Sequence, residues 1–183
     1  MSRSISLWMI LIVSILISSC TNTNKQNADK KNSAVTKVLQ QEDGSISLKI
    51  DKAECYSDMQ NPASNTAEWN VIVSKTGRFN VWMSSATKDT TDLKYKNSVM
   101  LSIHDNRLEA RPACDKVIQN SGDVTLPYFR ADSYMGSLFI QDTGLYNIQL
   151  INEKILPKNY KDKESSVAEN SRLLSVFLTP ATR

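Results

Sequence analysis

Residues 66–85 read TAEWNVIVSKTGRFNVWMSS, and this stretch decides the fold. Apolar residues recur at every second position on both sides of residues 75–77: Trp69, Val71 and Val73, then Phe79, Val81 and Met83. Successive side chains of a β-strand point to opposite faces, so a period of two indicates strands that bury one face. The Lys-Thr-Gly break at 75–77 is a turn signal. The stretch therefore predicts two consecutive half-buried strands.

The same period runs through the rest of the chain after residue 44. It predicts further strands at 46–50, 99–103, 108 onward, 128–130, 135–141, 146–150 and 172–178. In the last strand Leu174, Val176 and Leu178 share one face, and Pro180 ends the strand because proline cannot donate to a ladder. A helical period is not sustained anywhere, although 161–170 could form one helical turn. We therefore predict an all-β domain, a two-layer sandwich, over residues 45–183.

The first twenty residues look like a targeting signal. Arg3 precedes an apolar run, Leu7 to Ile17, that is too short to span a bilayer and fits the apolar region of a signal peptide. The following Ile-Ser-Ser-Cys at 17–20 resembles the bacterial lipobox. That resemblance implies cleavage after residue 19, a diacylglyceryl group on the Cys20 sulfur and an N-acyl chain such as palmitate. A signal anchor, or an ordinary signal with an incidental Cys20, is the alternative.

Residue 21 and the segment after it bear on location. Thr21 stands where Asp often marks inner-membrane retention of lipoproteins, so we expect the outer membrane. Residues 20–44 are rich in Asn, Lys, Gln, Thr and Ser, and such a segment buries too little apolar surface to offset its ordering entropy. We predict a flexible tether there, with a short helix at 34–41 as the alternative. The expected parts are thus 1–19 signal peptide, 20–44 lipidated cysteine and tether, and 45–183 sandwich.

Charge and residue inventory argue against two functional classes. The chain has 22 Lys and Arg against 19 Asp and Glu, a net charge of +3, and the basic residues are scattered along the sequence. Nucleic-acid binding requires them clustered, so we expect no nucleic-acid partner. The single histidine, His104, stands next to a predicted hairpin turn at 105–106, and hydrolase motifs such as G-x-S-x-G and H-E-x-x-H are missing. We therefore expect a protein that is not an enzyme.

Several motifs resemble one family of β-sandwiches. The quoted series A-x-W-N-V-x-V and T-G-R-F-N-V-W-M-S-S-A, at 67–73 and 76–86, resembles the second and third strands of galactose-binding-like jelly rolls of carbohydrate-binding modules. M-G-S-L-F-I-Q-D-T-G-L-Y-N-I-Q-L at 135–150 is similar to a later strand pair, and L-L-S-V-F-L-T-P at 173–180 to the closing strand. I-D-K-A-E-C-Y at 50–56 is loosely similar to the first strand. The resemblance implies a jelly-roll topology and an accessory, sugar-binding role.

The same resemblance indicates where a sugar would bind. Such modules stack an aromatic ring on the apolar face of a sugar and hydrogen-bond its hydroxyl groups, often on loops at one edge of the sandwich. The loop tyrosines are Tyr56, Tyr95, Tyr128, Tyr134 and Tyr160. The clustered candidates Tyr128, Arg130, Asp132 and Tyr134 stand first; the alternative is that these tyrosines close the ends of the core. Trp82 is either a surface platform or part of a sheet face, whereas Trp69 is expected in the core.

A cation and a disulfide are the remaining structural questions. The resemblance implies a structural calcium, for which Asp51, Glu54 and Asp142 are the matching carboxylates; the alternative is that all three are solvated. Once Cys20 is lipidated, two cysteines remain in an oxidising envelope. Cys55 and Cys114 either form a disulfide or remain two small buried apolar groups, and the sequence leaves both open.

Together these observations predict a lipid-anchored envelope lipoprotein of the outer membrane whose sandwich binds carbohydrate without catalysis. Its expected partners are the membrane, through the anchor, and a glycan. The alternative is a structural lipoprotein whose sandwich binds an envelope protein and no sugar. A convergence of the candidate tyrosines and carboxylates in the folded chain would favour sugar binding.

Overall fold

The computed structural model describes residues 37–155 and 171–181, all within one unit, Ala34–Arg183. The predicted signal peptide, Cys20, most of the predicted tether, Tyr160 and the predicted turn at 161–170 lie outside these residues. The strands are β1 (Val38–Leu39), β2 (Ile46–Lys49), β3 (Glu54–Tyr56), β4 (Thr66–Val73), β5 (Gly77–Thr87), β6 (Val99–Ile103), β7 (Asn106–Ala110), β8 (Lys116–Ile118), β9 (Phe129–Ile140), β10 (Gly144–Ile151) and β11 (Ser171–Pro180). Two 3₁₀ turns, η1 (Ile50–Lys52) and η2 (Pro62–Ser64), complete the described elements.

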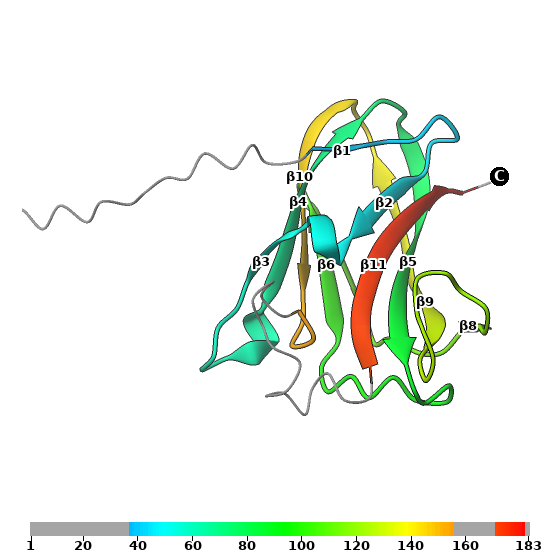
Figure 1. Ribbon diagram of the computed structural model, residues 1–183. Coiled ribbons are helices and arrows are strands. Elements are labelled where there is room, and N and C mark those ends of the chain that lie inside the picture. The colour runs from blue at the N-terminus through cyan, green and yellow to red at the C-terminus, as the bar shows by residue number, and fades with distance from the viewer. Residues whose placement is uncertain (1–36, 156–170, 182–183) are drawn as a thin grey trace, which may run out of the picture. The chain divides into compact units, whose positions relative to one another are not determined.

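The strands form two sheets that pack face to face (Figure 1). Sheet A has the order β1-β4-β10-β6-β7, with β3 also paired to β4, and sheet B has the order β2-β11-β5-β9-β8. Every pairing is antiparallel except β1 with β4. The predicted all-β, two-layer sandwich is confirmed. Within the described residues, no helix has the length and apolar character that a membrane crossing requires.

The core lies between the sheets and consists mainly of strand residues that the alternation marked as buried, together with Leu93, Tyr95 and Ile155 from loops. Strand β4 alternates buried and half-buried residues along its whole length, and β5 begins in the same way. Trp69 is 2% exposed, as predicted, and its indole Nε1–H donates to the Lys49 carbonyl at 2.9 Å. This bond satisfies the one polar group that the buried ring carries, so the ring joins the apolar core at little cost.

A β-bulge at Met135 changes which side chains of β9 point to the core. Val81 pairs with Gly136 and Trp82 pairs with Tyr134, so Met135 is the extra residue on β9. Beyond the bulge, Leu138 and Ile140 face the core; before it, Asp132 and Tyr134 face outward although they too are even-numbered. A single extra residue moves every later side chain to the opposite face. The two strands predicted at 128–130 and 135–141 are therefore one bulged strand.

Strand β11 carries a second bulge, at Leu174. Leu173 pairs with Ser85 and Ser175 pairs with the adjacent Ser84, which leaves Leu174 as the extra residue. Leu173 is buried and Leu174 is only half-buried. The prediction that Leu174 shares the core face of Val176 and Leu178 is therefore wrong, because the bulge exchanges the two leucines.

Three short strands were not predicted, and one of them lies in the predicted tether. Strand β1 pairs in parallel with β4, and the side chain of Gln40 binds the chain that follows β4: its Oε1 accepts hydrogen bonds from the backbone N–H groups of Ser74 and Lys75, at 2.8 and 2.6 Å. Residues 37–44 are thus part of the sandwich. Strands β1, β3 and β8 are two or three residues long, too short to show a period.

The two remaining cysteines are thiols in the structure and do not form the disulfide that the sequence left open. Cys55 lies in β3, on the edge of sheet A that β1 and β3 share. Cys114 lies between β7, the edge strand of sheet A farthest from β1 and β3, and β8, an edge strand of sheet B. The width of the sandwich therefore separates them. Both are half-buried against the core, and burial raises the pKa of the Cys114 thiol.

Candidate ligand-binding face

The outer face of sheet B brings together most of the residues that the sequence selected. Arg130, Asp132 and Tyr134 occupy every second position of β9 before the bulge at Met135. Their side chains therefore all point to the outer face of sheet B. Trp82 of β5 is the register partner of Tyr134 and points the same way. The prediction placed these residues on loops at an edge of the sandwich; the structure places them on the flat of a sheet.

Three aromatic rings cross this face from strand to strand. We call Tyr134, Trp82 and Phe177 the aromatic row; they are register partners on β9, β5 and β11. The Trp82 and Tyr134 ring centroids are 5.1 Å apart with planes at 56°, and those of Trp82 and Phe177 are 6.4 Å apart with planes only 7° from parallel. Tyr134 is 45% exposed. Trp82 and Phe177 are half-buried, so the row presents one exposed ring beside two partly exposed ones.

A charged network adjoins the aromatic row on the same face. Asp132 is 4% exposed and accepts hydrogen bonds from Ser84 Oγ at 2.7 Å and from Arg130 Nε at 2.8 Å. The Arg130 Nη1 donates to Asp123 at 2.8 Å, and its guanidinium carbon lies 5.6 Å from the centre of the Phe177 ring. The hydrogen bond to Asp132 raises the pKa of Arg130. The network therefore fixes the polar groups that border the rings.

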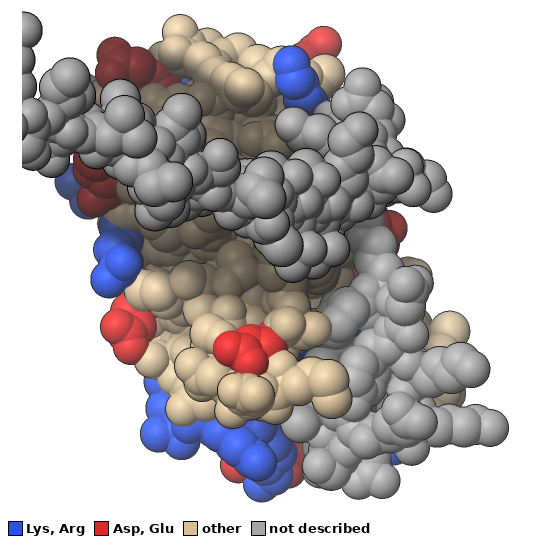
Figure 2. Space-filling view, turned by 90° about the vertical axis from the view of Figure 1, so that its left-hand side faces the viewer, with Lys and Arg blue, Asp and Glu red and all other residues tan. Residues whose placement is uncertain are grey.

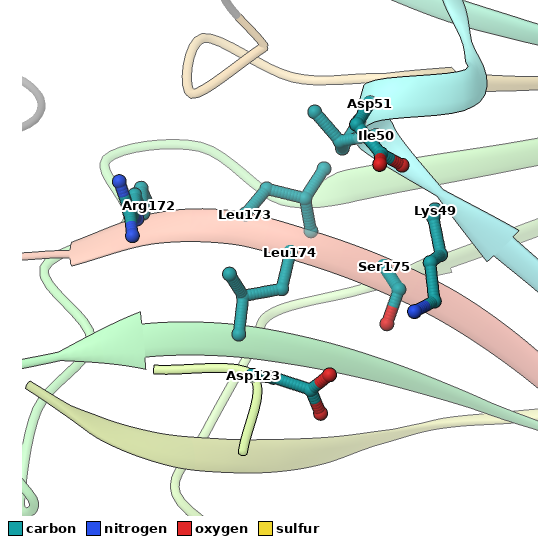
Figure 3. Close-up of a pocket in the computed structure, with 8 residues that line it drawn as sticks. All are labelled: Lys49, Ile50, Asp51, Asp123, Arg172, Leu173, Leu174 and Ser175. Atoms are coloured by element: carbon teal, nitrogen blue, oxygen red, sulfur yellow. The ribbon is translucent and has the colours of Figure 1, made fainter. Parts of the chain in front are cut away.

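A cleft of about 360 Å³ lies along the Arg172–Ser175 part of β11. Its lining includes Ser175, two residues before Phe177 on β11, and Lys49, the register partner of Ser175 on β2. In Figure 3, Leu174 points from β11 toward Asp123, and the Lys49 amino group lies beside Ser175. The bulge at Leu174 thus supplies an apolar wall between charged groups. The cleft and the aromatic row lie on consecutive positions of one face.

Tyr128 lies at the end of the same face, next to two cations. The Lys88 Nζ is 5.2 Å and the Arg172 guanidinium carbon 5.7 Å from the centre of its ring. Arg172 also lines the cleft. Cations near the face of a tyrosine ring are attracted to its π-electrons. Tyr128, the first of the candidates, is therefore connected to the cleft through Arg172.

Two features hold Tyr134 in place. Its backbone N–H, which lies beyond the last register pair of β8 with β9, donates to the Asp115 carboxylate at 2.7 Å. Gly136 has φ +123°, and a Cβ there would lie 2.9 Å from Leu108 Cδ1, so a side chain would disturb the bulge. Asp115 and Gly136 are positioning residues for the aromatic row, and the sequence analysis missed both.

Tyr56, Tyr95 and the single histidine lie away from this face. Tyr95 is buried, its hydroxyl is 2.9 Å from Ser85 Oγ, and burial raises its pKa. Tyr56 is exposed on β3 and donates to Glu54. Tyr95 is therefore part of the core, and its hydroxyl group is hydrogen-bonded inside the protein. His104 is exposed in the β6–β7 turn with φ +50°, as predicted for a turn histidine.

The three carboxylates predicted for calcium are not brought together. Asp51 lies in η1, Glu54 in β3 beside Glu68, and Asp142 in the turn between β9 and β10. Within the described residues, no group of three or more His, Cys, Asp or Glu could hold a metal ion. Calcium in proteins takes six to eight oxygen ligands, so these residues do not fit a shared site.

The opposite side of the sandwich has a different character. Its central register pairs on sheet A are polar: Glu68 with Gln149 and Asn70 with Asn147. The Asn147 amide donates to the Glu68 carboxylate. Figure 2 views this side, and it shows acidic and basic side chains spread mainly around the margin. The aromatic row belongs to sheet B alone.

Sequence reasoning also missed Phe177, Lys49 and Arg172. Each becomes part of the face only through pairing: Phe177 with Trp82, Lys49 with Ser175, and Arg172 with Ala86. Strand order and register depend on residues distant in sequence, so one strand's pattern does not contain them. The only local signal was that Phe177 alternates with Val176 and Leu178.

Comparisons with known proteins show the fold. No family model and no curated protein matches the sequence. Among solved structures, the chain is similar to part of an α-L-fucosidase from Vibrio sp. strain EJY3, with a TM-score of 0.61 and 21% identity over 78% of this chain and 24% of that one. The chain thus spans about a quarter of that protein. At this identity the likeness establishes a shared β-sandwich.

Two further similar structures have lower TM-scores. One is the GH26-CBM35 β-(1,4)-mannanase of Podospora anserina, with a TM-score of 0.46 and 12% identity over 77% of this chain and 28% of that one. The other is the CBM36-1 domain of a multidomain xylanase from the hindgut metagenome of Trinervitermes trinervoides, with a TM-score of 0.41 and 8% identity over 76% of this chain and 99% of that one.

Proposed function

We propose that the sandwich is a non-catalytic carbohydrate-binding module and that the outer face of sheet B is its sugar-binding surface. The observation that carries this proposal is the aromatic row of Tyr134, Trp82 and Phe177, bordered by the Arg130–Asp132 network and by the cleft. Sites for small polar ligands combine aromatic area with a few fixed polar groups, and this face has both.

The carboxylates of the face support a binding role over a hydrolytic one. Hydrolysis of a glycosidic bond by two carboxylates needs one as acid and one as base or nucleophile. Asp132 and Asp123 are both bound by Arg130, at 2.8 Å each. Because both carboxylates accept hydrogen bonds from one guanidinium, they belong to a fixed polar network that borders the rings.

The test is a glycan array probed with the protein and with two tyrosine variants. Tyr134→Ala removes the exposed ring of the row; Tyr56→Ala removes a ring of similar exposure, 53%, from sheet A and is the matched control. We expect a loss of affinity of about fivefold or more in the first variant and none in the second, because stacking of a ligand ring on an aromatic side chain contributes about 1–3 kcal/mol. Urea unfolding of both variants checks that each is folded.

The outcomes separate the two functions that the sequence suggested. Binding that Tyr134→Ala weakens and Tyr56→Ala leaves unchanged supports the proposal. A protein that binds no glycan, and that captures one envelope protein repeatedly regardless of added sugar, has the protein-interaction role instead.

We also propose that the protein is an outer-membrane lipoprotein. The support is the apolar run and the Ile-Ser-Ser-Cys sequence ending at Cys20, together with Thr21. Two or more acyl chains bind a bilayer stably, whereas one chain binds weakly. Metabolic labelling with radioactive palmitate should mark the protein and fail to mark a Cys20→Ser variant. Equal labelling of both would contradict the assignment, and fractionation of the envelope tests the membrane.

A further inference from the structure

The end of the sugar-binding face at Tyr128 carries cations that have no acidic partner among the described residues. Lys88 and Arg172 lie 5.2 and 5.7 Å from one ring, and neither makes an ion pair within that part of the chain. Two positive groups that share one tyrosine repel each other, and an anion between them would relieve the repulsion. This is a feature of an anion-binding site.

The nearby acidic groups do not pair with these cations. Asp123 and Asp132 both form ion pairs with Arg130, and neither lies within ion-pair distance of Lys88 or Arg172. On the far side of the cleft, Lys49 and Asp51 contribute one charge of each sign. Arg172 lies at the other end of the same cleft in Figure 3, so a ligand in the cleft reaches it directly.

We propose that the glycan bound on this face is acidic, with a carboxylate or sulfate group held at Arg172 and Lys88. The inference rests on the proposed carbohydrate-binding function and specifies its ligand. Sugar rings would lie on the aromatic row, and the chain would continue through the cleft, where Ser175 offers a hydroxyl group. Arginine binds carboxylate and sulfate through parallel N–H groups, which gives the acidic group a defined position.

Pairs of saccharides test this inference, because one member of each pair carries a free acidic group and the other lacks it. The pairs are galacturonan oligosaccharides and their methyl esters, glucuronoxylan and xylan oligosaccharides, and sulfated galactan and its desulfated form. Calorimetry on the full chain should show at least one acidic member binding about tenfold tighter than its neutral counterpart. That affinity should fall as salt is added, because salt screens charge pairs. The pair that responds distinguishes carboxylate from sulfate.

Variants assign the preference to the two cations. Lys88→Gln with Arg172→Gln should reduce the preference for the acidic member to about twofold or less. Arg107→Gln, an exposed arginine of β7 on sheet A, changes the net charge without touching the face and should leave the preference intact. Equal affinity for both members of every pair, or a preference that survives the double variant, overturns this inference and leaves the proposed function standing. Failure of every saccharide to bind overturns both.

Discussion

Replacement of Gly136 by alanine tests the bulge that places Tyr134 on the outer face. Gly136 has φ +123°, a conformation that costs a residue with a side chain about 1–3 kcal/mol. The new Cβ would also lie 2.9 Å from Leu108 Cδ1. Overpacking costs about 1–3 kcal/mol, and the lower end applies because that methyl group ends a flexible side chain. We therefore expect Gly136→Ala to destabilise the domain by about 2–4 kcal/mol.

Two other glycines separate the contributions. Gly144 has φ +144° and nothing within 4 Å of an added Cβ, so Gly144→Ala should show the backbone cost alone. Gly122 has open space and no positive φ, so Gly122→Ala should be neutral or slightly stabilising. Urea unfolding measures all three, and a lower midpoint at unchanged slope reports lost stability. If Gly136→Ala unfolds at the same urea concentration as Gly122→Ala, the bulge is not held as described.

Three further predictions concern charge and thiols. Asp132→Asn removes the charge of a buried carboxylate that binds Arg130, so it should lower the free energy of unfolding by about 2–4 kcal/mol. Asp123 is more exposed, so Asp123→Asn should lower it by less than about 1 kcal/mol. Equal losses in urea unfolding would refute this difference. Hydrogen bonds from Thr91 lower the pKa of Asp89 from 3.8 to about 2. The ionised carboxylate therefore adds stability above pH 4, and this stability is lost as the pH falls toward 2. In urea titrations across that window, Asp89→Asn should lose less stability than the unchanged protein, and parallel curves of stability against pH for the two proteins would contradict this. Cys55 and Cys114 should both alkylate in denaturant without reductant, as read by mass spectrometry; labelling only after reduction would show a disulfide.

The local pattern was sufficient to predict the fold class and the long strands. Strands β4 and β6 bury every second residue along their length, and β10 does so in its second half, as the alternation of residues such as Val71 and Ile148 predicts. Burial of apolar side chains on one face is a local property that two or three neighbouring residues reveal. The short edge strands β1 and β3 form because a partner strand is present, and their own sequences do not show it.

The bulges explain what the alternation could not predict. Leu138 and Tyr134 are an even number of residues apart and yet face opposite sides, which a continuous strand does not allow. The sequence analysis selected Arg130, Asp132 and Tyr134 because they cluster in the sequence, and it placed them on loops. Their common face depends on β9 running unbroken up to the extra residue at Met135. Phe177 joins them only through its register with Trp82. The candidate residues of β9 were thus predictable, whereas their position on the face of a sheet was not.

Tryptophan fluorescence tests the central claim, that a glycan binds on the outer face of sheet B. Trp82 is half-buried in the aromatic row, whereas Trp69 is 2% exposed in the core. A bound glycan should shift the emission of the protein and shield Trp82 from acrylamide, and Trp82→Phe should abolish both responses. Glycan binding by calorimetry with no change in emission or quenching would place the ligand elsewhere and contradict the account.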